Sequence, residues 1–130
     1  MAALFDAYRD KDIFATHKAE VADLVGTINL KGANVIMIAF PYLNNDDLLR
    51  ISEGLYIASL RDQFLKFCKS GDWFYDPSSA ALNLKVNKRV VNFMDAHPSA
   101  LLHAIVADEV GSLISPIEGK IPVEGATSCQ

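Results

Sequence analysis

The sequence predicts one small α/β domain with a short mixed sheet, a βαβ unit and flanking amphipathic helices. Its 130 residues are 51% hydrophobic and 22% charged, the size and balance of a single globular domain. Residues 35–40 read VIMIAF, an unbroken apolar run that predicts a strand buried on both faces. A long amphipathic segment at 46–69 and an aromatic run at 72–76 follow. Strand, helix and strand in that order predict a right-handed βαβ crossover.

The first helix is expected at 17–27. Its apolar residues recur at three-four spacing, and Thr16 can cap its first turn. Residues 1–15 show no clear period, so we expect an arm or a short helix lying on the body of the domain.

The segment 46–69 is expected to form the longest helix. Asn45 can cap its start, and Asp46 and Asp47 place negative charge in the first turn, where the helix dipole favours it. Two lysines lie in its last turn, where positive charge is favoured. The wide apolar stripe of this helix predicts that it covers the sheet.

The second half of the chain is expected to contribute an edge strand and two helices. Alternation of apolar and polar residues at 82–86 predicts a strand with one wet face. A helical stretch should begin at Asn87 and be interrupted at His97, because the residue before a proline avoids helical angles. The apolar spacing over 101–114 predicts another amphipathic helix, with Pro98 near its start.

The domain is expected to occupy residues 1–115. Residues 116–130 are rich in proline, glycine and small polar residues and are interpreted as a tail or linker stub, part of which can add an extended edge segment.

Composition and cysteine usage favour a protein of a reducing compartment. A chain of this length can bury a core without disulfides, so the two cysteines need no structural role. Cys68 is interpreted as a small buried hydrophobe and Cys129 as an exposed thiol in the tail, and their spacing matches no zinc site. No apolar run is long enough to span a bilayer, so we expect a soluble protein without a membrane partner.

No catalytic, cofactor-binding or metal-binding residues are predicted. The glycines do not cluster as phosphate-binding loops require, and the histidines are expected on the surface. The loop of Asn44, Asn45, Asp46 and Asp47 follows a predicted parallel strand, where α/β proteins often bind ligands, and its carboxylates suit magnesium. Helix capping explains the same residues and is the favoured interpretation.

Five residues are candidates for contact with RNA or a partner: Lys85, Lys88, Arg89, Trp73 and Tyr75. Cationic residues interleaved with aromatic rings suit single-stranded nucleic acid. The alternative places the aromatics in the core or an interface and lets the cations solvate helix ends. The net charge of −4 favours that alternative.

Part of the sequence resembles one viral protein family. Residues 30–39 (LKGANVIMIA), the Leu-Asn-Asn of 43–45, the leucine pair at 48–49 and the Asp-Trp pair at 72–73 carry the likeness. The sequence is similar there to the minor inner-capsid protein, protein seven, of the cystoviruses. These are enveloped bacteriophages with a segmented double-stranded RNA genome.

The resemblance implies a non-catalytic assembly cofactor of the viral polymerase complex, which helps the capsid form and the RNA segments enter. It places the protein in the inner capsid of the virion, and in the host cytoplasm during assembly. Capsid and polymerase proteins would be its partners, with single- or double-stranded RNA a further candidate. A homodimer is also expected, because symmetric pairing covers an exposed strand edge.

Two other functions are compatible with the same residues. One is a small metal-assisted α/β enzyme that uses the Asn44–Asp47 loop. The other is a bacterial regulatory or immunity-type binding module.

Overall fold

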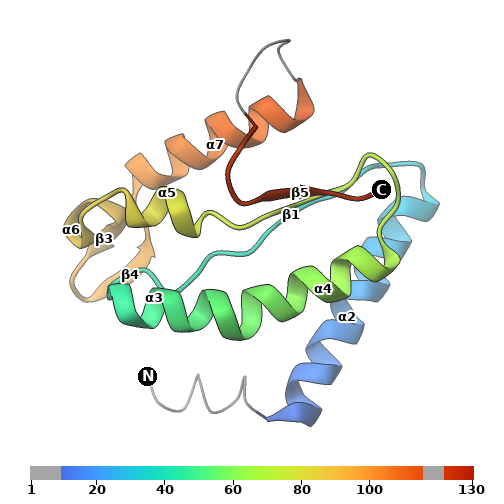
Figure 1. The fold of residues 1–130 in the computed structure, drawn as a ribbon, viewed down its shortest axis with the longest axis horizontal. Helices are drawn as coiled ribbons and strands as arrows, with labels where there is room; N and C mark the ends of the chain where they lie inside the picture. The colour runs from blue at the N-terminus through green and yellow to red at the C-terminus, as the bar shows by residue number, and fades with distance from the viewer. Residues whose placement is uncertain (1–9, 116–121) are drawn as a thin grey trace.

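The fold is an α/β arrangement around a three-stranded sheet (Figure 1). The computed structural model describes residues 10–115 and 122–130. Strands β1 (Ile36–Ile38) and β2 (Trp73–Tyr75) are parallel, with Ile36 opposite Trp73. Strand β5 (Ala126–Ser128) pairs antiparallel with the other edge of β2. The predicted α/β class and the parallel crossover are therefore confirmed.

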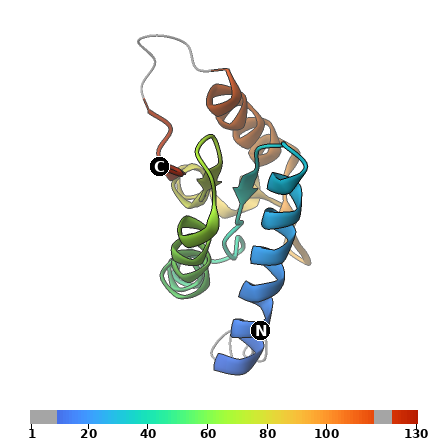
Figure 2. The same ribbon diagram turned by 90° about the vertical axis from the view of Figure 1, so that its right-hand side faces the viewer.

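Helices lie on both sides of this sheet, with α7 on one side and α3 and α4 on the other (Figures 1 and 2). The helical elements are α2 (Lys11–Leu30), α3 (Asp46–Ser52), the π-helical turn η1 (Glu53–Ile57), α4 (Ala58–Phe67), α5 (Ser78–Leu82), α6 (Val86–Arg89) and α7 (Ala100–Ile114). Strands β3 (Val90–Asn92) and β4 (Asp95–Pro98) form a separate hairpin. Within the described ranges, no helix combines the length and apolarity needed to cross a lipid bilayer.

Two apolar clusters make the core, and successive residues of β2 divide between them. Phe74 packs with Phe64 and Ile57, from α4 and η1, and with α2. Tyr75 packs with Leu102 and other residues of α5 and α7. Neighbouring residues of a strand point to opposite faces, so this central strand joins both halves of the core.

The first helix is longer than expected and has a different cap. The side chain of Asp10 accepts hydrogen bonds from the amides of Asp12 and Ile13, at 3.0 and 3.1 Å. Thr16, the predicted cap, instead donates to the carbonyl of Asp12 inside the helix. The stronger cap lies six residues earlier, so 11–15 are helical, and residues 1–9 of the expected arm lie outside the described part of the chain.

The long second helix forms as expected, but in three segments. Asn45 caps it by accepting from the amide of Leu48 at 3.0 Å. The π turn η1 separates α3 from α4, and the three segments run one after another along one side of the sheet (Figure 1). Gly71, with φ at +95°, makes the turn that leads into β2.

The expectation that VIMIAF is buried on both faces is wrong. Only Ile36–Ile38 are in a strand, and β1 is an edge strand, beside β2 alone. Ile38 is 36% exposed.

The predicted strand at 82–86 is wrong, and the helix predicted from Asn87 is only the short α6, because a hairpin replaces it from Val90 onward. The Asp76 side chain accepts from the amide of Ser78 and turns the chain directly into α5. The Asn92 side chain accepts from the amides of Met94 and Asp95 and closes the hairpin turn. Such local side-chain bonds offer the backbone an alternative to the regular structure that the apolar spacing favours.

The end of the chain is not simply a tail. Residues 126–128 form β5, which is the edge segment that the sequence allowed, while 116–121 lie outside the described residues. The interpretation of both cysteines as unpaired is wrong, because Cys68 and Cys129 form a disulfide. The two cysteines are 61 residues apart in the sequence, so no local pattern predicts that they pair. The fold brings them together.

Candidate interaction surface

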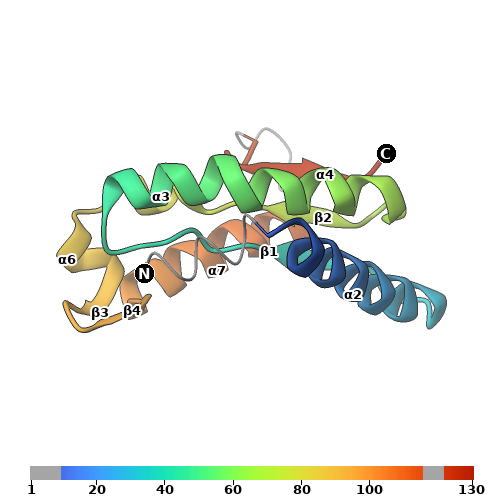
Figure 3. The same cartoon turned by 90° about the horizontal axis from the view of Figure 1, so that it is seen from below.

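Three large apolar side chains of the β3–β4 hairpin are exposed. Val91, Phe93 and Met94 are 55%, 86% and 81% exposed. We call these three side chains the hairpin surface. They lie at one end of the molecule, and the carboxyl terminus lies at the other (Figures 1 and 3). Clustered exposed side chains of this size are typical of a binding site.

The hairpin turn is ordered by its own polar residues. Asn92 accepts from the amides of Met94 and Asp95, at 2.9 and 3.0 Å. Asp95 in turn accepts from the amide of His97 and pairs with its imidazole. The hydrogen bonds from the backbone and side chain of His97 lower the pKa of Asp95 below its usual range. The turn therefore presents Phe93 and Met94 in a defined geometry.

The base of the hairpin is held by Arg89, a fully buried cation. Its guanidinium donates to the carbonyls of Leu43, at 2.6 Å, and Ala81, at 3.1 Å, and pairs with the Asp46 carboxylate. Three segments of the chain thus meet at one side chain. Burying a cation requires such partners, because an unpaired buried charge is strongly destabilising.

Hydrogen bonds of Ser99 also connect the hairpin to α7. Ser99 accepts from the amide of Leu102 as the cap of α7, and its hydroxyl donates to the carbonyl of Lys88 at 2.6 Å. Its amide donates to the Arg89 carbonyl at 2.9 Å. The hairpin is thereby fixed at both strands.

Two shallow hollows flank the hairpin. One, of about 370 Å³, is lined by Phe40 and Pro41 and by Met94 and β4. The second, of about 270 Å³, is bordered by Asn44, Val86 and Phe93. Met94 and Phe93 of the hairpin surface therefore each border a hollow that a side chain of a partner protein can enter.

The five predicted contact residues do not come together. Arg89 and Tyr75 are fully buried, so neither is available to RNA or to a partner at the surface. Trp73 is half-buried and lies beside Lys66 in a pocket near the disulfide. Lys85 and Lys88 are exposed on α6, next to the hairpin.

The residues of the hairpin surface were missed because their spacing resembles that of a helix. Val90, Val91 and Met94 recur at three-four intervals, which favoured a helix. Asn92 and Asp95 favoured a turn instead of a helix. Both are turn-forming residues at the first and last positions of a four-residue turn.

Two residues of the Asn44–Asp47 loop make structural contacts. Asn45 caps α3, and Asp46 pairs with Arg89. Across the described ranges, no three His, Cys, Asp or Glu side chains gather closely enough to hold a metal ion. His97 and His103 lie exposed, as expected.

A separate pair of carboxylates lies where β2 ends. Burial raises the pKa of Glu53, and the negative charge of nearby Asp76 raises it further, against the opposing charges of Arg50 and Arg61. Asp76 is itself engaged by the amide and hydroxyl of Ser78. We assign this pair no chemistry beyond closing the turn after β2.

The chain matches no family model, no curated protein and no solved structure. Its functional interpretation therefore depends on the surfaces described above and on the resemblance noted in the sequence.

Proposed function

We propose that this protein is a non-catalytic assembly factor that binds a protein partner through the hairpin surface. The observation that carries the proposal is the exposure of Phe93, Met94 and Val91 on a hairpin whose base is held by buried Arg89. Aromatic and methionine side chains are enriched at the centres of protein interfaces. A firmly held base also reduces the entropy lost on binding.

The resemblance to cystovirus protein seven indicates the class of partner. We propose capsid and polymerase proteins of a viral polymerase complex, met in the host cytoplasm during assembly and retained in the inner capsid of the virion. The residues that carry the resemblance lie at the end of α2, in and around β1, at the start of α3 and at the start of β2. None of the residues that carry the likeness is part of the hairpin surface.

The proposal is tested by co-sedimentation of the purified protein with a cystoviral polymerase complex. Burial of a large apolar side chain contributes about 1.5–3 kcal/mol, so Phe93→Ser with Met94→Ser should weaken binding by at least roughly 100-fold. Leu30→Ser is the matched control, because Leu30 is 91% exposed at the end of α2, away from the hairpin. It should bind like the unaltered protein.

Equal binding by the hairpin variant and the control would overturn the proposal. Far-ultraviolet circular dichroism must show that both variants remain folded. Loss of binding in Lys85→Ala with Lys88→Ala, with the hairpin variant unaffected, would instead favour an RNA-mediated contact. Formation of a homodimer stays a prediction, measurable by sedimentation equilibrium.

A further inference from the structure

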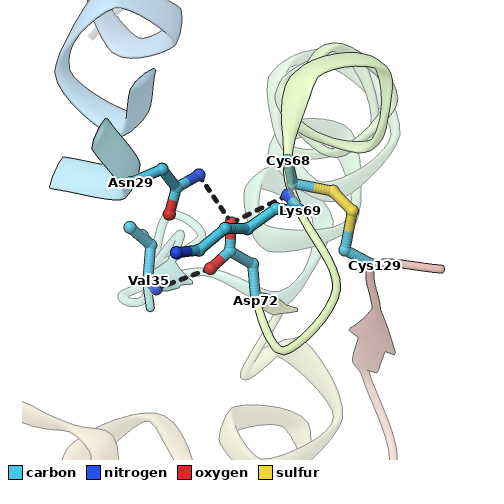
Figure 4. The surroundings of a disulfide bond; sticks show 6 residues. All are labelled: Asn29, Val35, Cys68, Lys69, Asp72 and Cys129. Atoms are coloured by element: carbon cyan, nitrogen blue, oxygen red, sulfur yellow. Dashed lines mark hydrogen bonds between the residues drawn. A yellow bond between two sulfur atoms is a disulfide. The ribbon is translucent and has the colours of Figure 1, made fainter. Parts of the chain in front are cut away.

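The Cys68–Cys129 disulfide joins the end of α4 to the last strand of the described chain (Figure 4). Cys68 directly follows α4, and its amide donates to the Phe64 carbonyl at 2.9 Å. Cys129 directly follows β5, and its amide donates to the carbonyl of Asp72 at 2.9 Å. The covalent bond therefore holds β5 in place at the point where the strand ends.

Apart from the disulfide, β5 is held by its pairing with β2 and by limited side-chain packing. Its residues, Ala126, Thr127 and Ser128, are small and partly buried, and they lie opposite only three residues of β2, with Ala126 packed against the core. At its start, Gly125 has φ at +86° and approaches the Asp76 carbonyl so closely that a Cβ would lie 2.1 Å away. Short strands with small apolar contact are the first parts of a sheet to open.

The disulfide is reachable from solvent on the Cys68 side, because Cys68 is partly exposed, whereas Cys129, expected to be an exposed thiol, is only 8% exposed. An open pocket of about 700 Å³ is lined by both cysteines, by Trp73 and Leu65, and by Lys66 and the terminal residue Gln130. Lys66 places a positive charge at this opening, which attracts an incoming thiolate. Exchange at a disulfide requires such access to one of its sulfurs.

From these observations we infer that Cys68–Cys129 is a site of thiol–disulfide exchange, whose reduction by a dithiol releases β5 from β2. A thiolate of the dithiol attacks one sulfur, the S–S bond breaks, and the other cysteine leaves as a thiolate that takes up a proton. The second thiol of the dithiol then displaces the remaining cysteine. The protein gains two electrons and two protons as two thiols, and the dithiol becomes a disulfide.

The release should be local. Phe74 and Tyr75 of β2 are held in the two core clusters by residues of α4 and α7, and β1 remains paired with β2. What reduction exposes is the edge of β2 that β5 covers, together with Trp73 in the pocket. This inference does not depend on the proposed function, because it concerns only contacts within the chain.

Hydrogen exchange on the oxidised protein, before and after treatment with dithiothreitol, tests the inference. Alkylation and mass measurement count the thiols released without denaturant. The amides of Cys129 and Asp76, which bond across the β2–β5 pair, should exchange at least tenfold faster once both thiols appear. The amide of Val106 in α7 should not change. Removing the reductant and reoxidising should restore protection.

The variant Cys68→Ser with Cys129→Ser should show the fast exchange with or without dithiothreitol. Trp73 is the only tryptophan, so its fluorescence gives a second readout that should change on reduction of the unaltered protein and not of this variant. Three results would overturn the inference: no thiols released under native conditions, protection retained after complete reduction, or loss of Val106 protection together with that of Cys129. The last would show that the disulfide stabilises the whole domain rather than β5.

Discussion

The two ends of this molecule are held by buried charges of opposite sign. At the hairpin end, the Arg89 cation is bonded to backbone carbonyls and to Asp46. At the disulfide end, the Asp72 carboxylate accepts from the amides of Val35, at 2.8 Å, and Lys69, at 3.0 Å, and from the side chain of Asn29, at 2.9 Å. Each charge joins three segments of the chain.

The two ends differ in which chemical changes can remove these bonds. The Arg89 guanidinium keeps its charge at any pH a protein meets, so its bonds to the carbonyls of Leu43 and Ala81 do not depend on pH. At the other end, the Asp72 carboxylate can be protonated and the disulfide can be reduced (Figure 4). We therefore expect the bonds of Arg89 to backbone carbonyls to persist under conditions that remove the Asp72 bonds or the disulfide.

The largest effect is expected from Arg89→Met. Methionine fills much of the space but donates no hydrogen bond, so the Leu43 carbonyl loses its buried donor and three segments lose their common contact. The free energy of unfolding should fall by about 3 kcal/mol, as measured by urea denaturation.

Asp46→Asn is the matched control for this change. The Asp46 side chain is 60% exposed, and an asparagine oxygen still accepts from Arg89. Its loss of stability should be about 1 kcal/mol or less. A loss equal to that of Arg89→Met would show that the ion pair, and not the bonds to carbonyls, holds this end.

An intermediate effect is expected from Asp72→Asn. Asparagine keeps one acceptor oxygen but replaces the other with an NH2 group, which faces at least one of the three existing donors, so the free energy of unfolding should fall by about 2 kcal/mol at neutral pH. Thermal and urea denaturation at pH 7 measure this loss. An unchanged stability would mean that the Asp72 bonds do not join the segments.

The same variant should show how the disulfide end responds to acid. Burial acts to raise the pKa of Asp72, but the bonds from Lys69, Val35 and Asn29 and the charge of Lys69 outweigh it and lower that pKa below the ordinary 3.8. A lowered pKa in the folded state contributes stability that is present above about pH 3.8 and is lost as pH falls through the folded value. The stability difference between the unaltered protein and Asp72→Asn should therefore shrink below pH 4. A constant difference for Asp72→Asn would contradict the assignment.

The smallest effect is expected from Glu53→Gln, between the two ends. Burial and the charge of Asp76 raise the pKa of Glu53 above 4.5, so its charged form disfavours the fold. Stability should fall as pH rises through the interval between 4.5 and the folded value, and the glutamine variant should lack that fall. At pH 7 the variant should be more stable by roughly 0.5 kcal/mol. Reduced stability at pH 7 would show instead that the attraction of Arg50 and Arg61 dominates.

Much of the first half of the fold was predictable, and most of the candidate surface was not. The parallel crossover and the cap at Asn45 follow from apolar periodicity and local capping, which depend on residues near in sequence. The hairpin was misread as a helix, because its apolar spacing outweighed the turn signals of Asn92 and Asp95. Arg89 was expected at the surface, because no local sequence pattern indicates that the carbonyls of Leu43 and Ala81 lie beside its side chain.

The sequence by itself determined the α/β class and the positions of α4, β2 and α7, because an apolar face must be buried wherever its period repeats. Only the tertiary structure decided that β1 is an edge strand, that Arg89 is buried and that Cys68 meets Cys129. Each of these depends on contacts between residues more than 30 positions apart. Such contacts are set by how the elements pack, and no local pattern of residue types records them.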